Sequence, residues 1–503
     1  QYNPFLYPAA ALQRRNEVLG KMAELHYITH AQAATARAAP LGVRHGNYYT
    51  RRQESFFFEY VRKQLVKRYG LNTVEQGGLK VYTTINLNMQ RQARNAIAHV
   101  LDEPGDPASA IVTIDPHNGY IDAMAESEGY DQSQYNLASQ GHRQPGSTFK
   151  AIVLADALSR GVDPNSTYYT SHTLSPGWLQ GYPTYEVKTF ENTSSGKSIN
   201  LVAATLASDN TVYAQLAADL GEETVTQMAY KLGVREHLHS YPAEALGGLT
   251  VGVSPLEMAD VYATFADGGW RNTPIAITKV VFPDGHTDTK WGKPHRVKVL
   301  SDGVTAEETE ILHQNVLGGT AGRSAINCPT AAKTGTTSNL VDAWLDGYMP
   351  NYSTSVWMGY PNKLVPMTDV HGEPQQGGYL PAEIWHAYMA AVTEGQSCVP
   401  FPSATEPISY QPFFGKFATT GQSSNSESSE GKESSETKVN KKSTPSEHHS
   451  PTAEQPSEHG NSESGQDQPA QRAREPVEPA PTPAAKAPVP PVGGTGGAEP
   501  PKH

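Results

Sequence analysis

The sequence contains very little cysteine, with two residues among 503, Cys328 and Cys398. Their spacing fits neither a zinc site nor a Cys-x-x-Cys redox pair. Two such residues are compatible with unpaired thiols or, if the protein is exported, with one disulfide bond, and the Cα separation that decides between them is not contained in a sequence. Metal or redox chemistry built on cysteine is therefore not expected.

Long apolar runs and an excess of positive charge are also missing. No stretch of about 18 apolar residues occurs, so the chain as given should not cross a membrane. The formal net charge of −12 argues against nucleic acid as a partner, since phosphate recognition needs clustered Lys and Arg. The 18 histidines form no His-Glu-x-x-His or similar ligand pattern, and neither a metal nor another cofactor is expected. The start at Gln1, without an initiator Met or a signal-peptide pattern, suggests a fragment of a longer protein, from which an anchor could have been cut away.

The composition of the sequence divides the chain into distinct parts. An apolar fraction of 37% is enough for a sizeable core. Helically spaced apolar residues predict helices over 9–25 and 56–69, and Gly70 is a suitable end for the second. After about residue 421 the sequence is dominated by Ser, Glu, Lys, Pro and Gly, which predicts a disordered tail.

Strand-like runs occur in two groups that lie far apart in the chain. Residues 110–114 and 120–125 flank an Asn-Gly turn, and a second group covers 331–336, 342–348 and 353–360. The stretch between the groups is mostly helical in pattern. This order predicts an α+β domain in which the two groups form a five-stranded antiparallel sheet covered by helices. A further strand over 80–85 and an amphipathic helix that ends near Val100 precede it.

One short motif has a direct chemical interpretation. Ser147 and Lys150 form a Ser-x-x-Lys that stands where Pro-Gly gives way to an apolar helical stretch. One helical turn places both side chains on the same face, where a lysine of lowered pKa can take the proton of the serine hydroxyl. The helix start also offers free backbone N–H groups to a developing oxyanion. The motif alone is unspecific, because the same spacing recurs by chance at Ser194, Ser429 and Ser435.

Two further elements follow in the order that serine acyltransferases of this kind require. Ser208-Asp209-Asn210 comes first, and Lys333-Thr334-Gly335-Thr336 stands on a predicted strand. Ser-x-Asn also occurs at Ser198. We favour Ser208, because an apolar run leads into it and a helical pattern follows it.

Together these residues resemble the penicillin-binding proteins, and among them the bifunctional class A enzymes of peptidoglycan synthesis. Further segments carry the resemblance, namely Val81-Tyr82-Thr83-Thr84-Ile85, Gly247-Gly248, Gly252-Val253-Ser254-Pro255-Leu256-Glu257-Met258-Ala259, Asp342-Ala343-Trp344 and Val356-Trp357-Met358-Gly359-Tyr360. It is dense from Val81 to Val392. Tyr2-Asn3-Pro4 and residues 14–19 look like the end of the family's glycosyltransferase domain, whose catalytic Glu motifs have no counterpart here, so the chain is not expected to polymerise glycan.

The resemblance implies a domain organisation. Residues 1–78 would be the end of the glycosyltransferase domain and a helical linker, 79–400 the transpeptidase domain, 401–420 a short extension and 421–503 the disordered tail. It also implies a location on the extracellular face of the bacterial cytoplasmic membrane, with the full-length protein anchored there. Cell-wall assembly proteins are possible partners.

The resemblance also implies a reaction. Ser147 would attack the carbonyl between the two terminal D-Ala residues of a peptidoglycan stem peptide, and an amine of a neighbouring stem peptide would then take the acyl group. Lys150 would be the base and Ser208 a proton relay, while Lys333 would keep the site electropositive. Beta-lactams would acylate the same serine.

Substrate contacts follow from the same resemblance. Asn210 would contact the donor peptide, and the hydroxyls of Thr334 and Thr336 would hold its terminal carboxylate. Gly335 lies between them on the substrate-binding strand. The backbone N–H groups of Ser147 and Thr336 would form the oxyanion hole.

Three alternatives remain. A serine beta-lactamase would need a Glu-directed water, and no Glu-x-x-Leu-Asn sequence lies between Ser147 and Lys333. A DD-carboxypeptidase would use water in place of the amine, which the motifs do not exclude. A beta-lactam sensor or wall-assembly scaffold would keep the fold without turnover. Trp344 and Trp357 could face a substrate groove, but aromatic residues in strands usually pack in the core.

Overall fold

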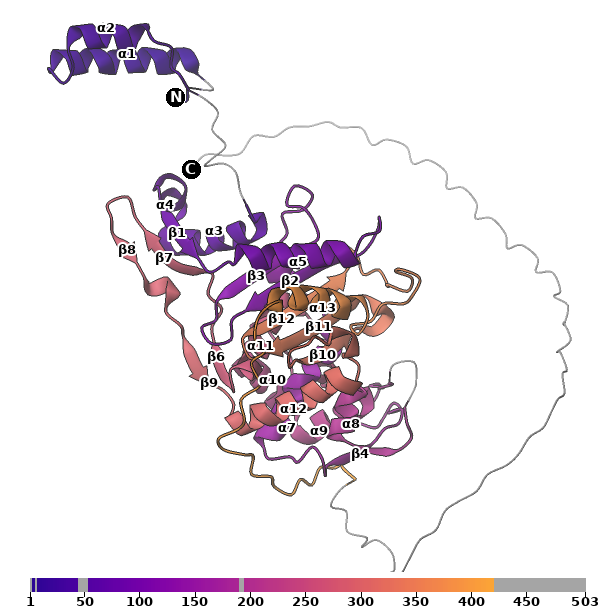
Figure 1. Ribbon diagram of the computed structural model, residues 1–503. Coiled ribbons are helices and arrows are strands. Elements are labelled where there is room, and N and C mark those ends of the chain that lie inside the picture. The colour runs from indigo at the N-terminus through magenta and orange to yellow at the C-terminus, as the bar shows by residue number, and fades with distance from the viewer. Residues whose placement is uncertain (1, 5–6, 44–52, 190–193, 420–503) are drawn as a thin grey trace, which may run out of the picture. The chain divides into compact units, whose positions relative to one another are not determined.

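The computed structural model of the protein describes residues 2–4, 7–43, 53–189 and 194–419 (Figure 1). The predicted disordered tail over 421–503 lies outside these residues, as do the chance motifs at Ser429 and Ser435. None of the helices in the described ranges is long and apolar enough to cross a membrane.

The first helices form a pair. α1 (Pro8–Glu24) lies against α2 (His30–Ala38), and the Arg15 guanidinium donates to the Ala39 carbonyl at 2.7 Å. Thr29 starts α2 with a reciprocal pair of hydrogen bonds to Gln32, a capping box. The helix predicted over 9–25 is thus present as α1.

A second helical segment leads to a small sheet. α3 (Ser55–Tyr69) ends at Gly70, whose φ of 81° lets the chain turn directly into α4 (Leu71–Gln76). β1 (Lys80–Thr83) then pairs with β7 (Ile277–Val281), which also pairs with β8 (Thr287–Asp288). The strand predicted over 80–85 is present and ends at Thr83, and its partner lies almost 200 residues downstream.

The central sheet has five antiparallel strands in the order β10-β11-β12-β2-β3. They are β2 (Ala108–Ile114), β3 (Ile121–Glu126), β10 (Ala331–Thr336), β11 (Asp342–Met349) and β12 (Tyr352–Gly359). The pairing of β12 with β2 joins the two groups of strands, as the sequence predicts. β10 is therefore an edge strand.

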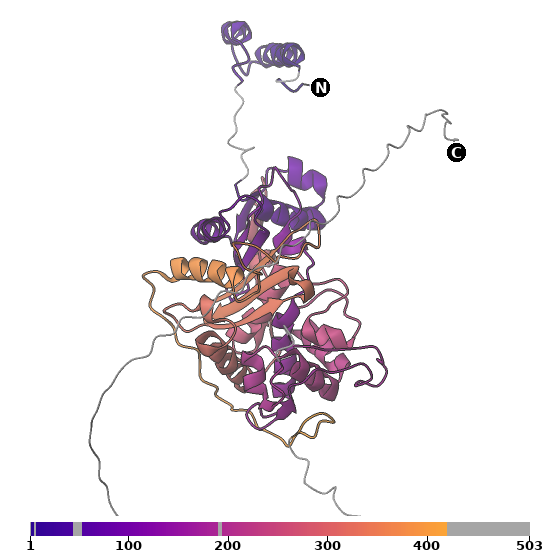
Figure 2. The same cartoon turned by 90° about the vertical axis from the view of Figure 1, so that its right-hand side faces the viewer.

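Helices cover both faces of this sheet. α7 (Lys150–Ser159) and α11 (Pro255–Ala266) pack on one face in the larger core, and α5 (Leu87–Val100) and α13 (Leu380–Thr393) pack on the other. In Figure 2 the orange helix α13 runs along one side of the sheet. α12 (Asp302–Gly318) contributes side chains to both cores. Trp344 and Trp357 are fully buried, so both are packing residues.

The region between the two strand groups is mostly helical but also contains short strands that the sequence analysis missed. Its main helices are α8 (Leu201–Leu206), α9 (Asn210–Leu220) and α10 (Glu222–Leu232). The shorter elements in or near this region are α6 (Leu137–Gln140), η1 (Gly146–Phe149), β4 (Tyr168–Thr170), β5 (Ser198–Asn200), η3 (Pro242–Leu246), β6 (Trp270–Asn272), η4 (Lys290–Gly292), β9 (Arg296–Lys298), η5 (Gly322–Ser324) and η6 (Ser338–Leu340). Strands of three residues give too little alternation to be recognised in a sequence.

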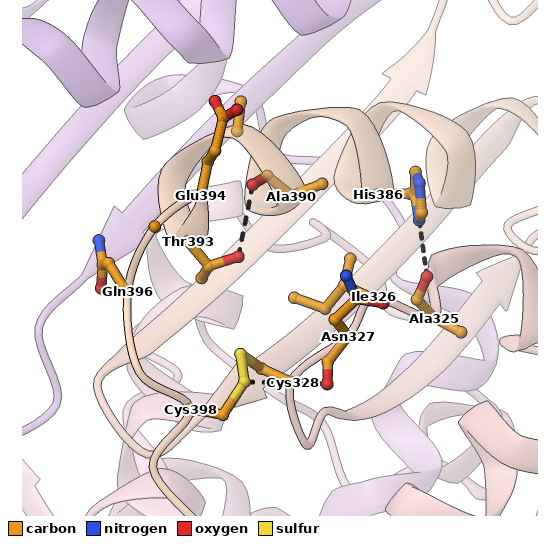
Figure 3. Close-up of a pocket in the computed structure, with 12 residues that line it drawn as sticks. Ala325, Ile326, Asn327, Cys328, His386, Ala390, Thr393, Glu394, Gln396 and Cys398 are labelled. Atoms are coloured by element: carbon orange, nitrogen blue, oxygen red, sulfur yellow. Dashed lines mark hydrogen bonds between the residues drawn. A yellow bond between two sulfur atoms is a disulfide. The ribbon is translucent and has the colours of Figure 1, made fainter.

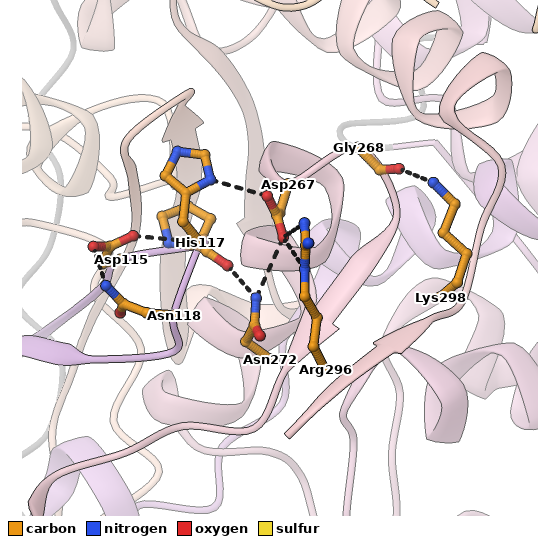
Figure 4. Close-up of polar contacts among 9 residues, drawn as sticks. Asp115, His117, Asn118, Asp267, Gly268, Asn272, Arg296 and Lys298 are labelled. Atoms are coloured by element: carbon orange, nitrogen blue, oxygen red, sulfur yellow. Dashed lines mark hydrogen bonds and ion pairs between the residues drawn. The ribbon is translucent and has the colours of Figure 1, made fainter. Parts of the chain in front are cut away.

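The turn between β2 and β3 is fixed to the end of α11 (Figure 4). His117 Nδ1 lies 2.9 Å from Asp267 Oδ1, and Asn272 Nδ2 donates to the Pro116 carbonyl at 2.7 Å. Gly119 has a φ of 78°, and a Cβ there would lie 2.5 Å from the Thr273 carbonyl oxygen. The predicted Asn-Gly turn is therefore present and needs its glycine.

Cys328 and Cys398 form a disulfide with a Cα separation of 5.2 Å (Figure 3). It joins the segment before β10 to the chain that follows α13, at the side of a cavity of about 890 Å³. Beyond it, residues 401–419 form no helix or strand, yet Phe401, Phe413 and Phe417 pack against the larger core. The bond thus holds the start of the strand that bears Lys333.

Candidate active site

Ser147 lies on η1, the tight turn that leads into α7. The turn is pressed against β10, since a Cβ on Gly146 would lie 2.6 Å from the Thr336 carbonyl oxygen. A Cβ on Gly335 would lie 2.2 Å from the Pro145 carbonyl oxygen. Only glycine at these two positions allows the backbones to approach so closely. The Ser147 hydroxyl has no hydrogen-bond partner among the described residues, and it is partly exposed.

Lys150, the first residue of α7, is fully buried beneath Ser147. Its Nζ donates to the Ser208 carbonyl at 2.6 Å and to Asn210 Oδ1 at 2.7 Å, and lies 3.4 Å from Ser208 Oγ. Burial, and then the nearby charge of Lys333, hold the pKa of Lys150 well below its usual range. A lysine in this environment is able to accept a proton.

Ser208 occupies a strained turn between α8 and α9, with a φ of 53°. Asp209 starts α9 by accepting hydrogen bonds from the backbone N–H groups of Thr211 at 2.8 Å and Val212 at 3.0 Å. The helix start therefore fixes the turn that presents Ser208 to the lysines.

Lys333 stands in the middle of β10 and is also fully buried. Its Nζ donates to Ser208 Oγ at 2.8 Å and to the Thr334 carbonyl at 3.2 Å. Burial lowers the pKa of Lys333 to about 7. The Ser208 hydroxyl is thus within reach of two lysines, Lys150 and Lys333.

A cleft of about 450 Å³ opens above this group of residues. Ser147, Asn210 and Thr336 line it, together with Gln144, Gly146, Tyr185, Glu186, Val187, Lys188, Thr189, Ala243, Leu246, Gly247, Gly248, Thr337, Ser338 and Asn339. Lys150, Ser208 and Lys333 are not among its lining residues, and the two lysines are fully buried. The cleft therefore presents a serine to a ligand and keeps the two lysines away from water.

The two threonines of β10 are placed differently. Thr336 lines the cleft, and its Oγ1 accepts a hydrogen bond from the Gly377 N–H at 3.1 Å. Thr334 is buried and does not line the cleft, and its hydroxyl is paired with that of Thr320 at 2.7 Å. Alternating residues of a strand point to opposite faces, which separates Thr334 from Lys333. Thr336 lies two residues further on and shares the face of Thr334, so the two threonines differ only in that Thr336 lines the cleft and Thr334 does not.

The competing motifs lie elsewhere. Ser198 is on β5, where its hydroxyl is 2.8 Å from that of Thr419, and Asn200 caps α8 by accepting from the Ala203 N–H at 2.9 Å. Lys197, the lysine of the Ser194 motif, is exposed. Neither motif has the buried lysine that Ser147 has.

Several site residues were not identified from the sequence. Glu186 and Lys188 form an ion pair of 3.0 Å on the wall opposite β10, and the Lys188 carbonyl accepts a hydrogen bond from Asn210 Nδ2. No motif marks this wall. Gly247 has a φ of 78°, and a Cβ there would lie 2.2 Å from the Gly146 carbonyl oxygen. The Gly-Gly pair was the available signal for this contact. Within the described ranges, no group of three or more His, Cys, Asp or Glu residues is arranged to hold a metal ion.

A comparison with known proteins identifies the same family that the site residues indicate. A family model described as the penicillin binding protein transpeptidase domain matches residues 109–390. Penicillin-binding protein 1A of Aquifex aeolicus (strain VF5) is 28% identical over 484 residues, which cover 78% of this chain and 64% of that protein. Penicillin-binding protein 1A of Mycobacterium tuberculosis (strain ATCC 25618 / H37Rv) is 29% identical over 446 residues, which cover 80% and 51%. The chain thus spans less than two thirds of the length of these relatives.

Solved structures give a similar result. The PonA1 protein from Mycobacterium tuberculosis in complex with penicillin V has a TM-score of 0.63 and 27% identity, covering 71% of this chain and 97% of that chain. Penicillin-binding protein 1A from Haemophilus influenzae also has a TM-score of 0.63, at 19% identity, with coverage of 80% and 79%. The second likeness is one of fold alone.

Proposed function

Because this chain belongs to the family of penicillin-binding protein transpeptidase domains and is homologous to class A members, we propose that it is a DD-transpeptidase that cross-links peptidoglycan stem peptides through an acyl-enzyme on Ser147. One observation carries the proposal. The buried Lys150, with its lowered pKa, and the Ser208 hydroxyl, within reach of Lys150 and Lys333, lie directly beneath an accessible serine.

In the first step Ser147 Oγ attacks the carbonyl carbon between the two terminal D-Ala residues. Lys150 takes the serine proton, because its neutral form is favoured by burial. Ser208 passes a proton towards the nitrogen of the leaving D-Ala, and its hydrogen bond from Lys333 orients the hydroxyl for this transfer. The bond to the terminal D-Ala breaks, and the ester on Ser147 remains.

The oxyanion and the substrate are held by the walls of the cleft. The backbone N–H groups of Ser147 and Thr336 stabilise the oxyanion, and the contact between Gly146 and the backbone of Thr336 supports this arrangement. Asn210 binds the donor peptide by its amide, and the Thr336 hydroxyl binds the terminal carboxylate. The Thr334 hydroxyl pairs with that of Thr320, and Thr334 does not line the cleft.

In the second step an amine of another stem peptide attacks the ester and restores Ser147. Water in place of the amine would make the protein a DD-carboxypeptidase, and the same serine would serve both reactions. The disulfide agrees with action outside the cytoplasm, since such bonds persist in oxidising compartments. Beta-lactams act as substrate mimics that acylate Ser147.

A labelled penicillin tests the acylation step. Mass spectrometry of a digest should find the label on Ser147, and Ser147→Ala should abolish the labelling. Ser198→Ala is the matched control, because that serine lies on β5 and its hydroxyl pairs with Thr419. Labelling that persists in Ser147→Ala would contradict the assignment of the nucleophile.

A further inference from the structure

A row of polar side chains crosses the sheet face that carries the serine turn. Lys333, Asp346 and Ser355 are direct cross-strand partners on β10, β11 and β12. Directly paired residues of antiparallel strands share a face of the sheet. All three are fully buried, and the next row on this face contains the tryptophans Trp344 and Trp357. A lysine and a carboxyl group therefore lie side by side in a largely apolar interior.

Few groups around the Asp346 carboxyl stabilise its charged form. Neither of its oxygens, nor Ser355 Oγ, has a hydrogen-bond partner among the described residues. Burial raises the pKa of Asp346 to about 7, while the nearby hydroxyls of Ser355 and Thr148 act in the opposite direction. Thr148 is the residue directly after the proposed nucleophile, so the carboxyl lies under the serine turn as well as beside Lys333.

Lys333 in turn lacks a direct counter-ion. Its two hydrogen bonds go to the Ser208 hydroxyl and the Thr334 carbonyl, and no carboxylate oxygen of the described residues, that of Asp346 included, lies within ion-pair distance of it. Burial lowers the pKa of Lys333 to about 7, so this lysine is about half neutral at pH 7. A site that needs the charge of Lys333 therefore needs a negative charge nearby.

The other ionisable groups around Asp346 do not supply that charge. Glu308 on α12 is buried, and both of its oxygens lack hydrogen-bond partners within the described part of the chain. Burial raises its pKa well above the usual range, so it stays neutral. Asp209 already accepts hydrogen bonds from Ser171 and from the start of α9. The remaining groups that face this interior are Lys150 at the start of α7, Tyr213 on α9, Tyr262 on α11 and Tyr348 on β11.

We propose that Asp346 is a positioning residue that acts through Lys333, with a carboxylate that favours, from beyond ion-pair distance, the protonated form of Lys333 beside Ser208. Opposite charges in a buried site favour each other, so the carboxylate form of Asp346 favours the ammonium form of Lys333. The retained charge of Lys333 lowers the pKa of Lys150, which keeps the base neutral. Asp346 thereby sets the pH range of acylation.

The pH profile of acylation tests this inference, which rests on the proposed function. The second-order rate constant for a fluorescent penicillin should fall on the alkaline side as Lys333 loses its proton. Asp346→Asn removes the negative charge, so the pKa of Lys333 should fall. The alkaline limb of the pH profile, where the rate constant decreases, should therefore lie about one pH unit lower than in the wild type. A merely structural role would lower the rate at every pH without moving the limb.

Glu308→Gln is the matched control, because it makes the same carboxyl-to-amide change at another buried position. Its alkaline limb should overlay that of the wild type. An unshifted limb in Asp346→Asn, or an equal shift in Glu308→Gln, would overturn the proposal. If Asp346→Asn does not fold, Asp346→Ser removes the same charge and carries the same expectation.

A direct titration separates this inference from the proposed function. The protein is labelled with 13C at the lysine Cε, and the Lys333 signal is assigned by its loss in Lys333→Arg. This signal reports the protonation of Lys333 without any acylation. The signal should titrate near pH 7 in the wild type and at a lower pH in Asp346→Asn. A Lys333 signal that titrates at the same pH in the wild type and in Asp346→Asn would refute the pairing, whereas a shifted titration in a protein that penicillin does not acylate would refute only the proposed function.

Discussion

Replacement of Gly335 by alanine should disable Ser147 without removing any functional group. The new Cβ would lie 2.2 Å from the Pro145 carbonyl oxygen and 2.8 Å from Thr148 Cγ2, whereas ordinary contact begins at 3.4 Å. β10 and the serine turn must therefore separate by about 1 Å, and a misplacement of that size costs about 100-fold in rate. Overpacking should also lower the free energy of unfolding, by about 1 to 3 kcal/mol.

The assay is the second-order rate constant for acylation by a fluorescent penicillin, with thermal melting to show that the variant is folded. Gly318→Ala is the control, because this residue ends α12 and a Cβ there meets nothing within 4 Å. We expect Gly318→Ala to acylate at the wild-type rate. A folded Gly335→Ala that acylates within about threefold of the wild type would refute the close approach of β10 to the serine turn.

Two further predictions concern the strand and its tether. Thr334→Val should leave the acylation rate near that of the wild type and should lower the free energy of unfolding by about 1 kcal/mol, because the hydrogen bond to Thr320 is lost. Thr336→Val should slow acylation about tenfold, because this residue lines the cleft. Equal effects of the two variants on the acylation rate would contradict the placement of the two threonines. Reduction of the disulfide between Cys328 and Cys398, which are 70 residues apart, should lower the free energy of unfolding, measured in urea, by about 4 kcal/mol. A reduced protein as stable as the oxidised one would contradict a structural role of the disulfide.

Much of the fold could be predicted because its signals are local. The hairpin around Gly119 and the three late strands each carry their own pattern, and antiparallel neighbours joined by short links leave few topologies. The pairing of β1 with β7 could not be predicted, since almost 200 residues separate the strands. The disulfide depends on a Cα separation that only the fold determines.

The site residues also divide into those that the sequence predicts and those that it does not. Ser147, Lys150, Ser208 and Lys333 were found because their spacing is tied to a chemical mechanism, and the structure brings them together. The pairing of the Thr334 hydroxyl with Thr320 could not be predicted, because the two residues lie on different elements that only the fold brings together. Asp346 was missed because sequence patterns place charged residues at the surface, and a buried carboxyl is recognised only when its neighbours are known.

Transfer of the acyl group to an amine is the central claim, and aminolysis measures it directly. A thioester donor that ends in D-Ala should be consumed by the protein, and an added D-amino acid should appear in the product at the expense of the free acid. Ser147→Ala should form neither product. Release of the free acid alone, at every concentration of the D-amino acid, would contradict a transpeptidase and establish a carboxypeptidase.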